Sequence, residues 1–223
     1  MLVNLNAIPA NRPRFLGELG TLPQTEIAPS EFKYRRGAEV FGEAETAEYV
    51  YQVIDGAIRS YKLLSDGRRQ IGAFHLIGDV FGLENSGVHR FTAEAIVDTT
   101  VRLVKRVSLV HVAESDATVA RDLLNMTATN LKHAEDHMLL LGRKTSLERV
   151  VAFLLEMDHR LTAAGVMALP MGRRDIADYL GLTIETVSRA LSALHDRGIL
   201  GFLGQTQRQI ILLDRPRLAE LDL

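Results

Sequence analysis

A short stretch near the C-terminus carries polar side chains whose types and spacing suit contact with DNA bases. At helical spacing, Glu185, Ser188 and Arg189 lie along one side of segment 181–194. An arginine can donate two hydrogen bonds to guanine O6 and N7, a glutamate can accept one from cytosine N4, and a serine can donate or accept. These three residues therefore predict a helix face that reads base edges in the major groove.

The same residues also fit a solvated helix surface. Glu185 and Arg189 stand four positions apart, and an ion pair at this spacing stabilises a helix by only about 0.2–0.5 kcal/mol. Taken in isolation, the pattern favours this ion pair. The neighbouring elements must therefore decide between the two interpretations.

The segments on either side of this helix favour DNA binding. A short helix over 173–180 comes first, Gly181 supplies a tight turn, and the Thr183 hydroxyl can cap the next helix by accepting backbone N–H groups. A helix, a short turn with glycine and a second helix form a helix-turn-helix motif. Gly198 ends the second helix, and 199–213 predicts a hairpin, or wing, with its tip at 205–207.

Upstream, the chain is rich in β-forming residues from about 32 to 112. Asp55-Gly56 and Asp66-Gly67 are both hairpin signals. Gly56, Gly67 and Gly78 are eleven residues apart, a spacing typical of strands and turns in a sandwich or barrel. We therefore expect a compact antiparallel roll, preceded by a proline-rich arm with one short helix near 15–19.

An apolar repeat follows the predicted roll. Its spacing of three and four residues is that of the a and d positions of a heptad, sustained for nearly three heptads. The repeat consists of Leu124, Thr127, Leu131, Ala134, Met138 and Leu141. Periodicity alone slightly favours a helix packed on the roll, and it leaves open a two-stranded dimer interface. Gly142 and Lys144 suggest a break before the next helix.

Composition limits the classes of function. The absence of cysteine excludes disulfides, thiolate-bound zinc and cysteine-held iron–sulfur clusters. Segment 145–223 holds nine Lys/Arg and ten Asp/Glu, so DNA binding would depend on the arrangement of charges and not on their sum. No apolar run approaches the roughly 18 residues of a membrane span, and no signal peptide opens the chain. We expect a cytoplasmic protein without a membrane partner.

Three stretches carry a resemblance to a known family. The stretch DIADYLGLTIETVSRALSALHDRGIL (175–200) resembles the DNA-binding element of the CRP/FNR superfamily, and its E-x-x-S-R pattern is that of the FNR and FixK branch. Residues 51–84 resemble the β-roll effector domain of that branch. Residues 137–157 resemble its dimer helix and the helix that follows.

The resemblance implies an α+β fold with four parts. An N-terminal arm (1–30) precedes a β-roll of the cyclic-nucleotide-binding type (31–116). A dimerisation helix (117–143) and a C-terminal winged helix-turn-helix domain (144–223) complete the chain. The heptad seam would then be the interface of a homodimer.

The resemblance also implies roles for particular residues. In each TTGAT-type half-site of a palindrome, Arg189 would read the guanine, Glu185 the opposing cytosine and Ser188 a neighbouring thymine. The candidates for contact with the DNA backbone are Arg173, Thr183, Thr186 and Arg208. For Arg173 and its neighbour Arg174, a merely solvated position is an equally good interpretation.

The predicted roll lacks the sequence marks of a ligand site. Phe91 separates Arg90 from Thr92, which breaks the Arg-Ser/Thr pair that binds a cyclic phosphate, so we expect no cyclic nucleotide. His133 and His137 have the spacing of a metal pair but no evident third ligand. We predict no cofactor and no metal. Haem binding stays open through one of three histidines: His75, His89 or His111.

Residues 65–70 correspond to the loop through which FNR-type proteins touch RNA polymerase, which makes Asp66, Gly67, Arg68 and Arg69 candidate contacts. The loop after His159 is a second candidate, and both loops could also be plain turns. The predicted function is a homodimeric, sequence-specific transcription activator of low-oxygen-responsive genes. The alternative is a haem- or small-molecule-gated regulator or repressor. We expect no enzyme, because no nucleophile–base pair, phosphate loop or three-ligand metal set is apparent.

Overall fold

The computed structural model describes residues 30–84 and 87–222. It consists of two compact units, and the division between them falls within one long helix, between Ala134 and Glu135. Apart from Ser30, the predicted arm and its short helix at 15–19 lie outside the described residues.

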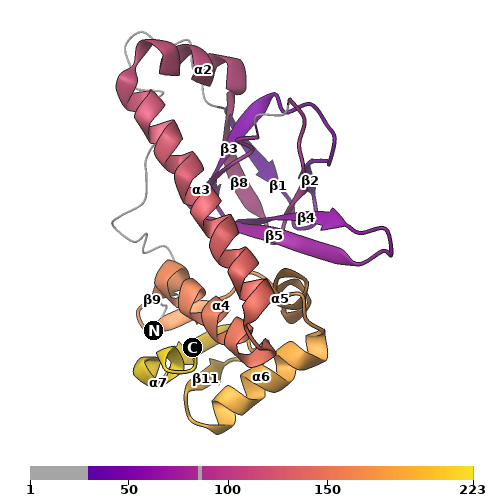
Figure 1. Ribbon diagram of the computed structural model, residues 1–223, viewed down its shortest axis with the longest axis vertical. Helices are drawn as coiled ribbons and strands as arrows, with labels where there is room; N and C mark the ends of the chain where they lie inside the picture. The colour runs from indigo at the N-terminus through magenta and orange to yellow at the C-terminus, as the bar shows by residue number, and fades with distance from the viewer. Residues whose placement is uncertain (1–29, 85–86, 223) are drawn as a thin grey trace. The chain divides into compact units, whose positions relative to one another are not determined.

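The N-terminal unit is built from two four-stranded antiparallel sheets (Figure 1). One sheet has the order β1-β8-β3-β6 and the other β2-β7-β4-β5. The strands are β1 (Ser30–Tyr34), β2 (Glu39–Phe41), β3 (Tyr49–Asp55), β4 (Ala57–Leu63), β5 (Arg69–Leu76), β6 (Val80–Phe81), β7 (Thr92–Ala95) and β8 (Thr99–Lys105). The predicted antiparallel roll is thereby confirmed.

Only one of the two predicted hairpin turns is a hairpin. β4 and β5 pair across Asp66-Gly67, as predicted. The prediction for Asp55-Gly56 is wrong, because β3 and β4 belong to different sheets and the chain turns a corner here. Gly56 has φ +88°, and a Cβ there would lie 2.5 Å from Thr99 Oγ1. This corner therefore requires glycine for its conformation and for the close approach of Thr99.

Apolar and aromatic side chains fill the space between the two sheets. They come from alternate strand positions, which point to the same side of a strand. The buried cluster comprises Phe41, Tyr51, Val53, Ile58, Phe81, Ala93, Ala95 and Val101. The His89 ring stacks on Phe41 with centroids 3.5 Å apart.

The chain leaves the roll earlier than its strand-like composition predicts. β8 ends at Lys105 and a helix, α2 (Arg106–Ser115), follows, so the expectation of strands up to 112 is wrong at its end. α2 buries Leu109 and Val112, while Val107 is 79% exposed. The Arg106 guanidinium fixes its start by donating to the carbonyls of Ala47 and Gly82.

A single helix, α3 (Ala117–Arg143), runs for 27 residues. Val119 is its one buried residue. None of the helices in residues 30–84 and 87–222 combines the length and apolar character that a membrane span requires.

Besides the end of α3, the C-terminal unit contains four helices and a small sheet of order β11-β12-β10-β9 within the residues described. Its further elements are α4 (Ser146–Leu161), β9 (Thr162–Ala163), β10 (Val166–Ala168), α5 (Arg173–Leu180), α6 (Ile184–Asp196), β11 (Leu200–Leu203), β12 (Gln209–Leu212) and α7 (Arg215–Ala219). Its core includes Phe153, Leu154, Met157, Leu180, Leu194 and Ile199, each at most 1% exposed. Helices α5 and α6 with the β11–β12 hairpin form the predicted winged helix-turn-helix.

Candidate nucleic-acid interface

The turn between α5 and α6 has the local chemistry that the sequence predicts. Gly181 ends α5 in the left-handed conformation, with φ +62°, which glycine adopts without steric cost. Thr183 is the N-cap of α6, and its Oγ1 accepts a hydrogen bond of 3.2 Å from the Thr186 backbone N–H. These two residues fix where α6 begins and how it leaves the turn.

Helix α6 has one buried side and one exposed side. Val187, Ala190, Leu191 and Leu194 are buried in the core of the unit. On the other side Glu185 and Arg189 are exposed and Ser188 is half-buried. The structure therefore brings the three predicted base-reading residues onto one face at the start of α6.

Glu185 and Arg189 do not form the surface ion pair that their spacing allows. The Glu185 carboxylate accepts hydrogen bonds from its own backbone N–H and from the Thr183 hydroxyl, and these hold its pKa below the usual value. Arg189 adds only a weaker coulombic attraction. Among the residues described, no hydrogen-bond or ion-pair partner holds the Arg189 guanidinium, so it can reach outward.

Ser188 has a partner that the sequence did not predict. Arg173, the first residue of α5, donates from Nη1 to Ser188 Oγ over 3.1 Å. Its Nη2 donates to Oε1 of Gln207, which lies in the wing between β11 and β12. Its guanidinium also lies 6.0 Å from the centre of the Phe202 ring. Arg173 therefore links α5, α6 and the wing.

The other predicted backbone contacts border the same region. Thr183 is exposed and Thr186 half-buried, and their hydroxyl oxygens are 3.1 Å apart. Arg208, also half-buried, has its Nη1 3.4 Å from the Pro170 carbonyl oxygen. A cavity of about 190 Å³ lies between α5, α6 and the wing, with Arg173, Gln207 and Arg208 in its lining.

Arg149 on α4 holds the motif against the end of α3. Its guanidinium donates to three backbone carbonyls, those of Leu141 (2.7 Å), Lys144 (3.0 Å) and Leu180 (3.0 Å). Leu180 directly precedes the Gly181 turn. Sequence reasoning missed this residue; the available signal was a lone arginine beside the apolar positions of α4.

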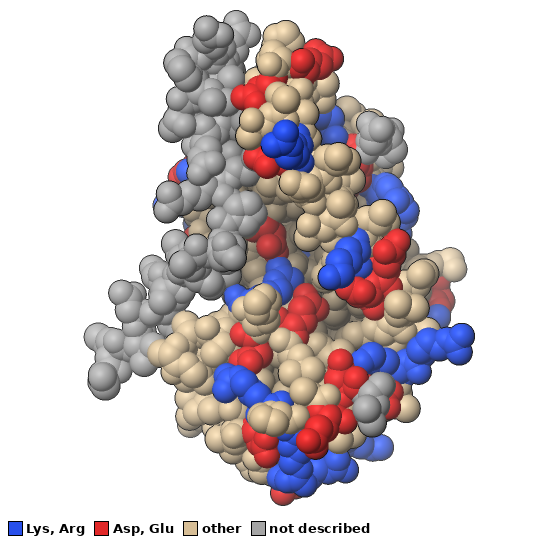
Figure 2. All heavy atoms as spheres, turned by 60° about the vertical axis from the view of Figure 1, so that its left-hand side comes forward, with Lys and Arg blue, Asp and Glu red and all other residues tan. Residues whose placement is uncertain are grey.

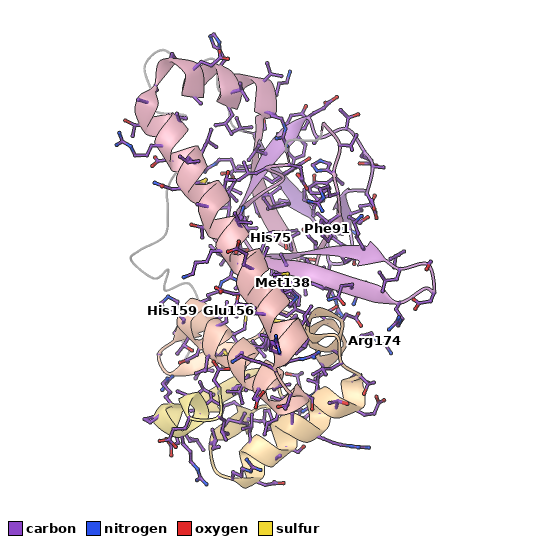
Figure 3. All side chains as sticks on the ribbon, viewed as in Figure 1. His75, Phe91, Met138, Glu156, His159 and Arg174 are labelled. Atoms are coloured by element: carbon purple, nitrogen blue, oxygen red, sulfur yellow. The ribbon has the colours of Figure 1, made fainter. Side chains whose placement is uncertain are left out.

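The heptad seam of α3 is open in the single chain. Leu124, Leu131 and Met138 are 68%, 58% and 65% exposed, respectively; the Met138 position is marked in Figure 3. Thr127 and Ala134 are also exposed, and Leu141 is half-buried. The interpretation as a helix packed on the roll by this seam is therefore wrong. The second interpretation, a two-stranded dimer interface, stays a prediction that this exposure is compatible with.

The three histidines considered for haem each have partners within the roll unit. The His89 ring is 2% exposed, with Nδ1 3.3 Å from Glu84 Oε2. His75 Nε2 lies 2.8 Å from Ser60 Oγ, and His111 Nδ1 lies 3.8 Å from Glu114 Oε2 on α2.

No group of three or more histidine, aspartate or glutamate side chains among the described residues could hold a metal ion. Of the two histidines at metal-pair spacing, His133 and His137, the second stacks on Tyr179 with ring centroids 4.1 Å apart.

Phe91, which interrupts the phosphate-binding pattern, packs on the roll (Figure 3). A Cβ on Gly72 of β5 would lie 3.0 Å from Phe91 Cε1. The Lys62 ammonium lies 5.7 Å from the centre of the same ring. Phe91 thus lies directly against Gly72 of β5, where a Cβ would be in tight contact with its ring.

The β4–β5 hairpin extends beyond the other strands of the roll (Figure 1). Arg68 Nε donates to Asp66 Oδ2 over 2.7 Å, and hydrogen bonds from Arg68 hold the pKa of Asp66 below its usual value. The Arg69 guanidinium lies 5.5 Å from the centre of the Tyr61 ring. Asp66 and Gly67 thus have a role in the turn itself, while the Arg68 side chain is 78% exposed.

Charge on the molecule is mixed in sign. Figure 2 shows basic and acidic side chains side by side over the visible face, in keeping with a formal net charge of −2. The visible face therefore carries no broad basic coat.

Comparison with known proteins gives the same fold and the same class of function. Residues 31–116 match the cyclic nucleotide-binding domain model, and residues 148–221 match the Crp-like helix-turn-helix domain model. The nitrogen fixation regulation protein FixK of Azorhizobium caulinodans is 44% identical over 85% of this chain and 77% of its own length. The transcriptional activatory protein AadR of Rhodopseudomonas palustris is 40% identical over 80% and 77%.

A solved structure extends the match to three dimensions. FixK2 from Bradyrhizobium japonicum is 68% identical, covers 88% of this chain and 98% of its own, and superposes with a TM-score of 0.85. These matches span the roll and the helix-turn-helix, whose geometry carries the outward-facing Glu185, Ser188 and Arg189. The chain is a transcription regulator that belongs to the CRP/FNR family, with FixK proteins among its relatives.

Proposed function

We propose that the chain acts as a homodimeric transcription activator that binds a palindromic TTGAT-type DNA site in the cytoplasm. The observation that carries the proposal is the outer face of α6. Its acid and arginine are not paired with each other. Glu185 lies in the first turn of α6 and Arg189 about one turn further on, near the end from which side chains reach base edges in this motif.

Each base-reading residue has a proposed partner. Arg189 donates to the guanine of the half-site, and Glu185 accepts from the N4 amino group of the opposing cytosine. Ser188 contacts a neighbouring thymine. Thr183, Thr186 and Arg208 are proposed to contact phosphates, which fixes the register without reading sequence.

Dimerisation is proposed to occur through the α3 seam formed by Leu124, Thr127, Leu131, Ala134, Met138 and Leu141. Its exposure in the single chain supports this assignment. Two copies side by side would bury the apolar positions and present two α6 helices to successive major grooves, about 34–36 Å apart.

Contact with RNA polymerase is proposed for the β4–β5 hairpin, with the exposed Arg68 and the half-buried Arg69 as its charges and Asp66 and Gly67 as its turn. The relative AadR is named as a transcriptional activatory protein, which supports activation over repression. The FixK relatives are named for regulation of nitrogen fixation, and low-oxygen-responsive genes remain our proposal for the targets.

The assignment of Arg189 is tested by measuring affinity for duplexes that carry the half-site guanine or another base. Arg189→Ala should lose about 1–3 kcal/mol of binding free energy on the guanine-containing site and little on the others. Arg174→Ala is the matched control, because Arg174 is an exposed arginine on α5 outside the α6 face (Figure 3). Equal weakening on every sequence would make Arg189 a phosphate contact and contradict the assignment.

A further inference from the structure

Arg173 stands behind the face that is proposed to read bases. It is half-buried at the start of α5, and its two terminal nitrogens serve different elements, Ser188 of α6 and Gln207 of the wing. The Arg173 guanidinium thus donates two of its hydrogen bonds to other side chains of the protein. The Arg189 guanidinium, in contrast, points outward from α6.

The contact with Ser188 has a defined polarity. A guanidinium has donors and no acceptor, so Ser188 Oγ must accept from Arg173 Nη1. The positive charge also repels the hydroxyl proton and turns the O–H bond away from Arg173. Ser188 therefore presents its O–H as a hydrogen-bond donor on the side away from Arg173. A second donor that approached the Ser188 oxygen would be repelled by the positive charge of the guanidinium.

We infer that Arg173 is a specificity-determining positioning residue, which holds Ser188 as a donor toward hydrogen-bond acceptors on base edges. In the major groove these acceptors are thymine O4, guanine O6 and N7, and adenine N7, whereas cytosine presents the N4 donor. The inference rests on the proposed function and deepens it. Under it, Ser188 discriminates against cytosine at its position because of Arg173, which itself does not touch the base.

The second contact of Arg173 is with the wing. Gln207 has φ +53°, a left-handed conformation that is uncommon outside glycine, and its side-chain oxygen accepts from Arg173. The same guanidinium therefore fixes the wing tip and the Ser188 oxygen. A wing contact with the DNA backbone would thus be set in register with the Ser188 contact.

The test measures affinity for four duplexes that differ only at the base pair read by Ser188, at several salt concentrations. Arg173→Gln and Ser188→Ala should each lower discrimination at that pair by about fivefold, the share of one neutral hydrogen bond. The double variant should lose no more than either single variant, because both remove the same contact. The slope of log affinity against log salt should stay unchanged in Arg173→Gln.

Two control variants separate Arg173 from its neighbours. Arg174→Gln removes an adjacent exposed arginine and should leave discrimination at the Ser188 position intact. Gln207→Ala removes the wing contact alone and should also leave that discrimination intact. Thermal unfolding measures whether each variant is folded; if Arg173→Gln is not, Arg173→Lys replaces it, since a flexible ammonium keeps the charge but not the fixed fork geometry.

Two results would overturn the inference. If Arg173→Gln weakens binding to all four duplexes equally and lowers the salt slope by about one, Arg173 is a phosphate contact. If discrimination at the Ser188 position is unchanged, Arg173 does not act through Ser188. Failure of the proposed function is distinguishable, because the wild type would then bind none of the duplexes or Arg189→Ala would keep its preference for guanine.

Discussion

At the scale of single residues, short contacts set the start of α6 and the position of Ser188: Thr183 caps the helix, and Arg173 Nη1 lies 3.1 Å from Ser188 Oγ. Thr183 and Gly181 have the cap and turn roles that their types predict, because each role depends on backbone within a few positions. The partner of Glu185 was not predictable, since an ion pair four residues on and a hydrogen bond at the helix start compete over similar distances. The Arg173–Ser188 contact spans 15 residues, and no local pattern encodes it.

Asp158 and Arg215 join α4 to α7 through a two-point contact that the sequence did not indicate. Arg215 Nε and Nη2 donate to Asp158 Oδ2 and Oδ1 over 2.8 and 3.0 Å. Chiefly this contact holds the pKa of Asp158 below its usual value, with a further hydrogen bond from Thr162. The contact ties the last helix to the core of the C-terminal unit.

The lowered pKa predicts how stability depends on pH. The unfolded carboxyl binds a proton near pH 3.9 and the folded one only at lower pH, so the contact stabilises fully above the unfolded value and is lost as pH falls through the folded value. Asp158→Asn should lower the free energy of unfolding at pH 7 by up to about 1 kcal/mol. Denaturant unfolding should show this difference shrinking below about pH 4. Glu220→Gln, an exposed change near the C-terminus, is the control, and a difference constant with pH would contradict the account.

At the scale of elements, periodicity located the helices but could not say what covers them. The heptad spacing gives the same pattern for a core helix and for a dimer helix, because both bury one apolar stripe. Only the solvent exposure of these side chains in the folded chain bears on which helix is present, and Leu131 and Met138 are exposed. The sequence around Gly56 did not show whether β3 and β4 pair with each other. The Asp-Gly turn signal is the same for a hairpin and for a corner between two sheets.

Helix α2 forms where the sequence predicts a strand. Its first residues include Val107 and Val110, β-branched residues that are typical of strands, yet both are exposed on a helix. The helix is held at its start by Arg106, whose acceptors Ala47 and Gly82 are distant in sequence. Tertiary contacts therefore override the local preference for a strand.

The seam assignment predicts a clear effect on association. Leu131→Glu places a charge in the middle of the proposed interface, so sedimentation equilibrium should show monomers at concentrations where the wild type is dimeric. Leu139→Glu is the matched control, because Leu139 is 58% exposed on the same helix but lies outside the a and d positions. A dimer that persists in Leu131→Glu, or is lost equally in Leu139→Glu, would show that the seam is not the interface.

At the scale of the whole molecule, the fold class and the regulator function were predictable, because three motifs along the chain pointed to one family. The match to FixK2 at a TM-score of 0.85 covers the roll and the helix-turn-helix together. The near-neutral charge explains why composition alone gave no sign of DNA binding. That sign came from the placement of three side chains on one helix face.

The central claim is that two copies of α6 read a symmetric DNA site. The most direct test is selection of bound sequences from random DNA by the full chain. The account predicts enrichment of inverted repeats of a TTGAT-type half-site, with half-site centres about 10 base pairs apart. Enrichment of single half-sites, of an unrelated sequence, or of no sequence at all would contradict it.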